Sequence, residues 1–231
     1  MRAFYILLAV IAVLEGCTAI YFAEPQPQSA GILNSFPKEF QGAFFIDEEG
    51  MDTLFIEDSK YIYPEVFEKY IPTDKLDSLI NIKIVGDLLY DDSVPTTKGI
   101  KFTITSDTLH YRIRLNLFKS LSDSLVLKKH KGVLILSEKE ENKNYWNVYI
   151  IEKLKNNNLK LSAIGNFKTE KTTHQKIKFD GNLEDFYSIT DFQEIDTAKY
   201  LINPTDKEFK KLLKKGLFIE FAEYRKITNH P

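Results

Sequence analysis

Histidine, cysteine and serine are among the residue types of this chain that could support catalysis, if their spacing is suitable. The four histidines stand at positions 110, 130, 174 and 230, and none has a partner at the spacing of a metal site such as His-Glu-x-x-His. No serine lies in a Gly-x-Ser-x-Gly context, and no glycine-rich phosphate loop is present. A single cysteine excludes a disulfide framework and a multi-cysteine zinc site. The sequence therefore predicts a protein without a metal, a cofactor or a local catalytic motif.

A cluster of basic residues offers a possible anion-binding surface. His110, Arg112 and Arg114 alternate along a predicted strand and share one face of it. Two guanidinium groups about 7 Å apart could hold a phosphate or a sulfated sugar. The alternative is a solvated sheet face whose cations pair with acidic residues on the neighbouring strand. We favour this second interpretation.

Two charged segments have compositions that could suit binding loops. Residues 47–52 place four carboxylates around a turn, and Ca²⁺ prefers oxygen-rich loops, but the spacing is not that of an EF-hand. Residues 168–178 contain four lysines without interleaved aromatic residues. We predict a polar hairpin tip for the first segment and an exposed loop for the second.

The strand around Trp146 is apolar on both faces. Trp146, Val148 and Ile150 point one way, whereas Tyr145, Tyr149 and Ile151 point the other way, with Asn147 interrupting that second set. The favoured interpretation is a central core strand covered by other layers. The alternative is a binding site for a partner or glycan at Tyr145, Tyr149 and Trp146, because tyrosine gives amphipathic contact area. That alternative requires at least one of the two tyrosine rings to be substantially exposed.

The N-terminus has the composition of a signal peptide. Arg2 is followed by twelve uncharged residues, a run too short for a typical membrane span. The next four residues, Leu14-Glu15-Gly16-Cys17, resemble the lipobox of bacterial lipoproteins, although Glu15 departs from the small, uncharged residue usual at its position. The resemblance implies removal of residues 1–16 and a lipid (diacylglyceryl with palmitate-type chains) on Cys17. The alternative, an uncleaved anchor from Phe4 to Phe22, would place Glu15 in the bilayer at a cost of a few kcal/mol.

Residues 17–36 are expected to form an extended tether behind the lipid. Pro25 and Pro27 favour polyproline geometry and oppose a helix. Pro25-Gln26-Pro27 followed by Phe36–Gly42 resembles the opening of uncharacterised β-rich lipoproteins from Gram-negative bacteria. This resemblance covers about the first 45 residues and implies no activity. It implies a location in the cell envelope, anchored to a bacterial membrane, most simply the outer membrane.

Residues 37–231 are expected to form one β-rich globular domain. Apolar side chains alternate with polar ones over residues 109–117 and 101–105, and Ser106-Asp107 between them predicts a hairpin. Short runs of the same kind recur along the chain and are separated by polar turns. They predict a mainly β fold, either an antiparallel sandwich or a barrel-like meander.

Helical signals are confined to two segments. Thr205 and Glu208 have capping-box spacing, and Gly216 provides a stop, so a helix is predicted over 206–215 with a strand over 217–227. Pro72-Thr73-Asp74-Lys75 begins like Pro204-Thr205-Asp206-Lys207 and predicts a second short helix.

The composition limits the classes of function. The chain has 31 basic and 33 acidic residues and a formal charge of −2, without the basic excess of a nucleic-acid-binding protein. We expect a lipid-anchored, non-catalytic envelope protein whose β-rich domain binds another envelope protein or a glycan, or serves structurally. One alternative is a lipocalin-like carrier of a small apolar ligand, because Phe40–Phe44 is similar to the Gly-x-aromatic start of such barrels. An envelope hydrolase is the second alternative.

Overall fold

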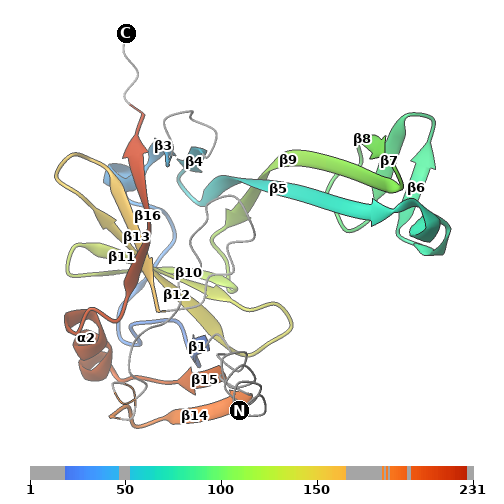
Figure 1. Cartoon of the computed structure of the whole chain (residues 1–231). Helices are drawn as coiled ribbons and strands as arrows, with labels where there is room; N and C mark the ends of the chain where they lie inside the picture. The colour runs from blue at the N-terminus through green and yellow to red at the C-terminus, as the bar shows by residue number, and fades with distance from the viewer. Residues whose placement is uncertain are drawn as a thin grey trace, which may run out of the picture. The chain divides into compact units, whose positions relative to one another are not determined.

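The computed structural model describes residues 19–46, 53–164, 184, 186, 188–196 and 199–227 (Figure 1). Most of these residues lie in β-strands, nearly all of them paired antiparallel, which confirms the predicted mainly β class. The chain divides into two compact units. The inserted unit is Ile62–Phe118, and the large unit comprises the chain before and after it. The single domain expected over residues 37–231 is therefore two units in the structure.

The large unit contains a sheet in the strand order β14-β15-β1-β12-β13-β16-β3-β4. A branch of β11, β10 and β2 leaves this path at β12. Strand β1 pairs in parallel with β15, and so joins the start of the described chain to a segment near its end. The strands are β1 (Ala19–Phe22), β2 (Ile32–Leu33), β3 (Gly42–Phe45), β4 (Thr53–Ile56), β10 (Leu125–His130), β11 (Val133–Lys139), β12 (Trp146–Lys153), β13 (Leu159–Ala163), β14 (Phe192–Asp196), β15 (Lys199–Ile202) and β16 (Ile219–Lys226).

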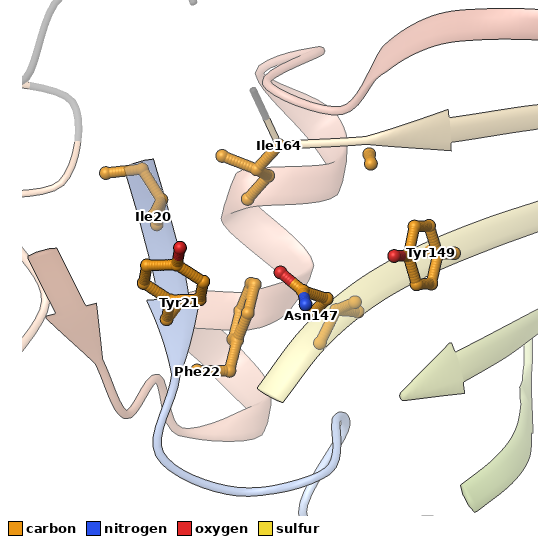
Figure 2. A pocket seen from close by; sticks show the side chains of 8 residues that line it. Ile20, Tyr21, Phe22, Asn147, Tyr149 and Ile164 are labelled. Atoms are coloured by element: carbon orange, nitrogen blue, oxygen red, sulfur yellow. The ribbon is translucent and has the colours of Figure 1, made fainter. Parts of the chain in front are cut away.

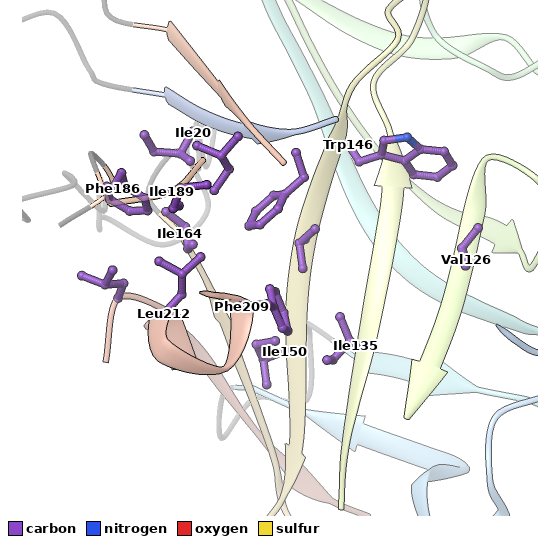
Figure 3. Packing of buried hydrophobic residues seen from close by; sticks show 14 residues of the cluster. Ile20, Val126, Ile135, Trp146, Ile150, Ile164, Phe186, Ile189, Phe209 and Leu212 are labelled. Atoms are coloured by element: carbon purple, nitrogen blue, oxygen red, sulfur yellow. The ribbon is translucent and has the colours of Figure 1, made fainter. Parts of the chain in front are cut away.

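The main core of the large unit lies between this sheet and helix α2 (Asp206–Lys214), as Figure 3 shows. Strand β12 contributes Trp146, Val148 and Ile150, the three residues predicted to share one face. Helix α2 contributes Phe209 and Leu212, which are 0% and 2% exposed. The period-two pattern of β12 and the helical spacing of α2 therefore point their apolar side chains into the same core.

Helix α2 begins and ends where its sequence predicts. The Thr205 side chain accepts a hydrogen bond from the Glu208 backbone N–H, and the Glu208 carboxylate accepts one from the Thr205 backbone N–H, which completes a capping box. Gly216 follows the helix with a φ of +69°, a conformation that favours glycine. Strand β16 then begins at Ile219, which confirms the predicted helix followed by a strand.

Residues 19–36 are part of the fold, which differs from the extended tether expected there. Ile20 and Phe22 of β1 are 4% and 1% exposed and belong to the main core. Gln26 is also buried, and its backbone N–H donates to Ser137 Oγ over 3.1 Å. The physical reason is burial: β1 lies between β15 and β12 in the sheet, and this position removes the apolar side chains of Ile20 and Phe22 from water.

A buried lysine holds the segment after β1 in place. Lys128 Nζ of β10 donates to the carbonyl oxygens of Pro25, Pro27 and Gln28 over 3.0, 2.8 and 3.4 Å. Burial lowers the pKa of this ammonium, although the nearby carboxylates of Asp206 and Glu24 oppose the shift. Pro25 and Pro27, which were expected to keep this segment as an extended tether, accept hydrogen bonds from Lys128 through their carbonyl oxygens.

The strands of the inserted unit follow the order β5-β9-β8-β7-β6. Its strands are β5 (Lys60–Pro72), β6 (Ile82–Val85), β7 (Leu88–Asp91), β8 (Ile100–Thr105) and β9 (Thr108–Ser120), and the unit boundary falls within β5 and β9. Its core contains Ile71, Leu89, Val94, Ile100, Leu109 and Tyr111.

Local turn chemistry explains two features of the inserted unit. Strands β8 and β9 form the predicted hairpin through a two-residue turn, in which Ser106 has a φ of +58°. The second predicted helix start gives only the 3₁₀ helix η2 (Thr73–Ser78), which has no side-chain cap. Leu76 stands where a capping box needs the carboxylate that Glu208 supplies to α2, so the repeated Pro-Thr-Asp-Lys has different outcomes.

Candidate functional site

The tyrosines of β12 form part of a packed face rather than an exposed platform. Both Tyr145 and Tyr149 are half-buried. The Tyr145 ring lies 4.4 Å from the Tyr21 ring, and the Tyr149 ring lies 6.4 Å from the Phe221 ring, centroid to centroid. Trp146 points to the opposite face, into the main core. The substantial exposure that a binding site at these tyrosines requires is therefore not met.

A small cavity lies beside these residues, between β1, β12 and the end of β13 (Figure 2). Tyr21, Asn147, Tyr149 and Ile164 are among its lining residues. Its volume is about 10 Å³, which is room for about one water molecule. This cavity is too small for a sugar ring or a lipid, so it lends no support to a carrier function.

The three basic residues predicted to share a face lie on β9 of the inserted unit. His110 Nε2 lies 2.8 Å from Glu68 Oε1 of β5, and its ring stacks on Tyr70 at 4.3 Å between centroids. Hydrogen bonds from His110 and Tyr70 lower the pKa of the Glu68 carboxyl, and Arg112 adds to the shift through its charge. Glu68 is the cross-strand acidic partner that our favoured interpretation expected for His110.

Strand register identifies what else lies on this face. Thr103 of β8 stands opposite His110, so Lys101, two residues before Thr103, lies on the same side. Leu88 of β7 stands opposite Lys101, and Lys83 of β6 stands opposite Tyr90. Residues of opposite faces alternate, and Leu109 and Tyr111 point into the core. We call the surface with Lys101, Arg112 and Arg114 the basic face; all three side chains are exposed.

The opposite face of the same sheet contains a buried polar network that sequence reasoning missed. Asp91 is 3% exposed and accepts hydrogen bonds from Lys69 Nζ at 2.7 Å and from the Tyr111 hydroxyl. Its other oxygen accepts from the Ser93 backbone N–H and hydroxyl at 2.8 and 2.6 Å, and from Asn81 at 3.3 Å. A signal was available, because Tyr111 alternates with buried Leu109 and a buried hydroxyl needs a partner.

Burial and hydrogen bonding shift the pKa of Asp91 in opposite directions. Burial by itself raises the pKa of this carboxyl, but the hydrogen bonds from Lys69, Ser93 and Tyr111 outweigh burial and hold the pKa far below its ordinary value of 3.8. Burial and the hydrogen bond to Asp91 raise the pKa of the Tyr111 hydroxyl. The carboxylate is therefore ionised and the phenol protonated near neutral pH. A pair in these states forms a hydrogen bond that stabilises the fold.

Large apolar side chains are exposed mainly on the inserted unit. Among the described residues it holds six of the ten exposed large hydrophobic side chains, although it is about a quarter of the chain. An open groove of about 480 Å³ lies at its β6–β7 end. Residues that line this groove include Ile80, Ile82, Lys83, Val85, Tyr90 and Asp92.

Several predictions fall on residues outside the described ranges. Cys17, the acidic turn over 47–52 and the lysines over 168–178 all lie there. Within the described ranges, no group of three or more His, Cys, Asp or Glu side chains could hold a metal ion. No helix among the described residues has the length and apolarity needed to cross a membrane.

Comparison with known proteins adds no assignment. No family model, no curated protein and no solved structure matches this chain.

Proposed function

We propose that this chain is a lipid-anchored, non-catalytic protein of the bacterial envelope, and that its inserted unit binds a partner protein. The N-terminal sequence supports the anchor, through the short apolar run and Leu14-Glu15-Gly16-Cys17. The exposed apolar side chains of the inserted unit support the binding function.

The observation that carries this proposal is the exposure at the β6–β7 end of the inserted unit. Ile80 is fully exposed, and Ile84 and Val85 are 41% and 51% exposed. Exposed apolar groups that gather in one place are typical of protein-binding surfaces, whereas single ones are ordinary. Here they adjoin a groove lined by Val85, Tyr90 and Ile80.

Strand β6 suggests how the partner binds. It is the last strand in the order of its sheet, so one of its edges has no strand beside it among the described residues. Such an edge can pair with an extended segment of another protein, whose main chain provides hydrogen bonds and whose alternate side chains fill a neighbouring groove. Lys83 and Asp92 in the groove give it one charge of each sign to select polar positions of that segment.

Site-specific photo-crosslinking in cells tests the binding site. A photoreactive residue at Val85 should give one discrete protein adduct, and the same residue at Ile195, an exposed position of the large unit, should not. Ile80→Asp should reduce the yield of the Val85 adduct, whereas the matched change Ile195→Asp should leave it unchanged. The same adduct from both positions, or none from Val85, contradicts the proposal.

Mass spectrometry of the membrane-extracted protein tests the anchor. The mature chain should begin at Cys17 and carry a diacylglyceryl group, and Cys17→Ala should accumulate as an unprocessed precursor. Cys17 is the only cysteine, so the modified peptide is unambiguous. An unmodified Cys17 in a chain that still begins at Met1 would refute the anchor without affecting the binding site.

A further inference from the structure

We propose that the basic face of the inserted unit is a second binding surface, for a linear acidic polysaccharide. It differs from the β6 edge in its chemistry, and its central residues do not line the groove there, although Lys83 belongs to both surfaces. It goes beyond the partner-binding function proposed above. Its central residues are Lys101, Arg112 and Arg114, with the stacked rings of Tyr70 and His110 beside them.

Basic and acidic side chains are segregated within the inserted unit. Residues 62–118 contain seven basic and eight acidic side chains, so the unit as a whole has no basic excess. By register, four of the seven basic residues share one face, namely Lys83, Lys101, Arg112 and Arg114.

The acidic residues are placed differently. Glu68 lies on the basic face and is engaged by His110 and Tyr70, and Asp92 lines the groove near Lys83. The six others lie elsewhere: at the core, on the opposite side of β5, in η2 or in turns, as Asp91, Glu65, Asp74, Asp77, Asp87 and Asp107. The sheet therefore presents one cationic side, which complements an anionic partner.

The cations of the basic face form a row. Arg112 and Arg114 are two residues apart on one strand, so their side chains leave the sheet about 7 Å apart along it. Lys101 projects from the neighbouring strand β8, on the same face. A row of this kind meets successive anionic groups on a linear chain, and guanidinium groups bind carboxylate or sulfate in a bidentate manner.

An aromatic pair, Tyr70 and His110, borders the row. Tyr70 is 65% exposed, and its ring lies nearly parallel to that of His110, with 13° between the two planes. Hydrogen bonds to Glu68 hold both the Tyr70 hydroxyl and the His110 ring, which fixes the orientation of the pair. A fixed, exposed ring offers a flat apolar surface to a sugar ring, and a nearby carboxylate can accept hydrogen bonds from sugar hydroxyls.

Binding of defined polysaccharides to the detergent-purified full chain tests this inference. We expect binding to polygalacturonate and to dextran sulfate, none to neutral dextran, and weakening as salt rises from about 50 to 300 mM. Arg112→Gln combined with Arg114→Gln should weaken binding about tenfold. Tyr70→Ala should weaken binding of polygalacturonate, and Tyr70→Phe, which keeps the ring, should not.

A charge-matched variant separates a specific site from general attraction. Lys75→Gln combined with Lys98→Gln removes the same charge from η2 and from the loop before β8, and it should leave the affinity unchanged. Circular dichroism should show that all variants keep the wild-type fold. Equal losses in the two double variants, wild-type affinity in the arginine variant, or binding to anionic lipid vesicles alone would overturn the inference. None of these results bears on the crosslink at Val85, so the two proposals fail separately.

Discussion

At the scale of single residues, the inserted unit depends on a carboxylate that carries no sequence motif. Asp91 joins three strands, because it receives hydrogen bonds from Lys69 of β5, Tyr111 of β9 and Ser93 next to its own strand β7. Removing one member of a buried polar group leaves its partners unpaired, which costs more than the group contributes when it is intact. The Lys69 side chain is 40% exposed, so water can hydrogen-bond to its ammonium group and offset part of the free energy that Lys69 loses without Asp91.

We therefore predict that Asp91→Ala destabilises the inserted unit by about 2–4 kcal/mol. Asp92→Ala, at the exposed neighbouring position, should change the stability by under about 0.5 kcal/mol. Hydrogen exchange resolved by peptide would assign the loss to residues 62–118. Equal effects of the two substitutions would show that the network does not stabilise the unit.

The same carboxylate predicts a pH dependence with a definite sign. Its pKa in the folded chain lies far below the ordinary value of 3.8, so its stabilising contribution is complete above that value and is lost as the pH falls through the folded pKa. The difference in unfolding free energy between the wild type and Asp91→Asn should thus be constant near neutral pH and shrink below about pH 4. A gap that widens on acidification would contradict this assignment.

At the scale of elements, helix α2 shows how local and tertiary signals agree. Its capping box sets the start, and its apolar side chains at Phe209 and Leu212 enter the main core. The matching motif that begins at Pro72 has Leu76 where α2 has the carboxylate of Glu208, and it forms only the 3₁₀ helix η2. Short capping signals thus determine where a helix begins, whereas packing determines how much it stabilises.

We predict that Leu212→Ala destabilises the large unit by about 2–4 kcal/mol, because it leaves a cavity in the main core. Lys211→Ala, at the adjacent exposed position, should change the stability by under about 0.5 kcal/mol. Denaturant unfolding followed by the fluorescence of Trp146, which lies in the same core, measures both. If the two variants unfolded alike, α2 would not be docked on the sheet.

At the scale of the whole molecule, the fold of the large unit begins close to the predicted lipid attachment site. Ala19, the first residue of β1, is buried and stands opposite Lys199 in parallel register. The segment that we expected to be a tether because of its prolines is instead held by hydrogen bonds from Lys128 to the carbonyl oxygens of Pro25 and Pro27. A chain anchored at Cys17 would accordingly have only Thr18 between its lipid and its folded part.

This predicts where the chain can be shortened. A chain that begins at Thr18 should fold, whereas one that begins at Phe36 loses Ile20 and Phe22 from the main core and should be destabilised by more than about 4 kcal/mol. Thermal unfolding followed by circular dichroism compares the two. Ile20→Ser in the longer chain should reproduce part of the loss, and equal melting of the two chains would mean that β1 does not contribute to the core.

The sequence by itself determined the features that depend on neighbours a few residues apart. The alternation over residues 101–117 predicted the β8–β9 hairpin, and the capping box predicted α2 followed by β16. Both signals are local, since the side-chain period of a strand and the capping of a helix involve residues within one turn or one pair of strands. The mainly β class follows from the same local signals repeated along the chain.

Only the tertiary structure decided which of these elements meet. The parallel pairing of β1 with β15 joins residues that are far apart in the sequence, so no local pattern could distinguish strand β1 from a tether. Likewise, alternation placed Arg112 beside His110, but only the pairing of strands showed that Lys101 shares their face and that Glu68 of β5 contacts the His110 ring. Register between distant strands depends on the packing of the whole sheet, and therefore decides which charges and rings form a surface.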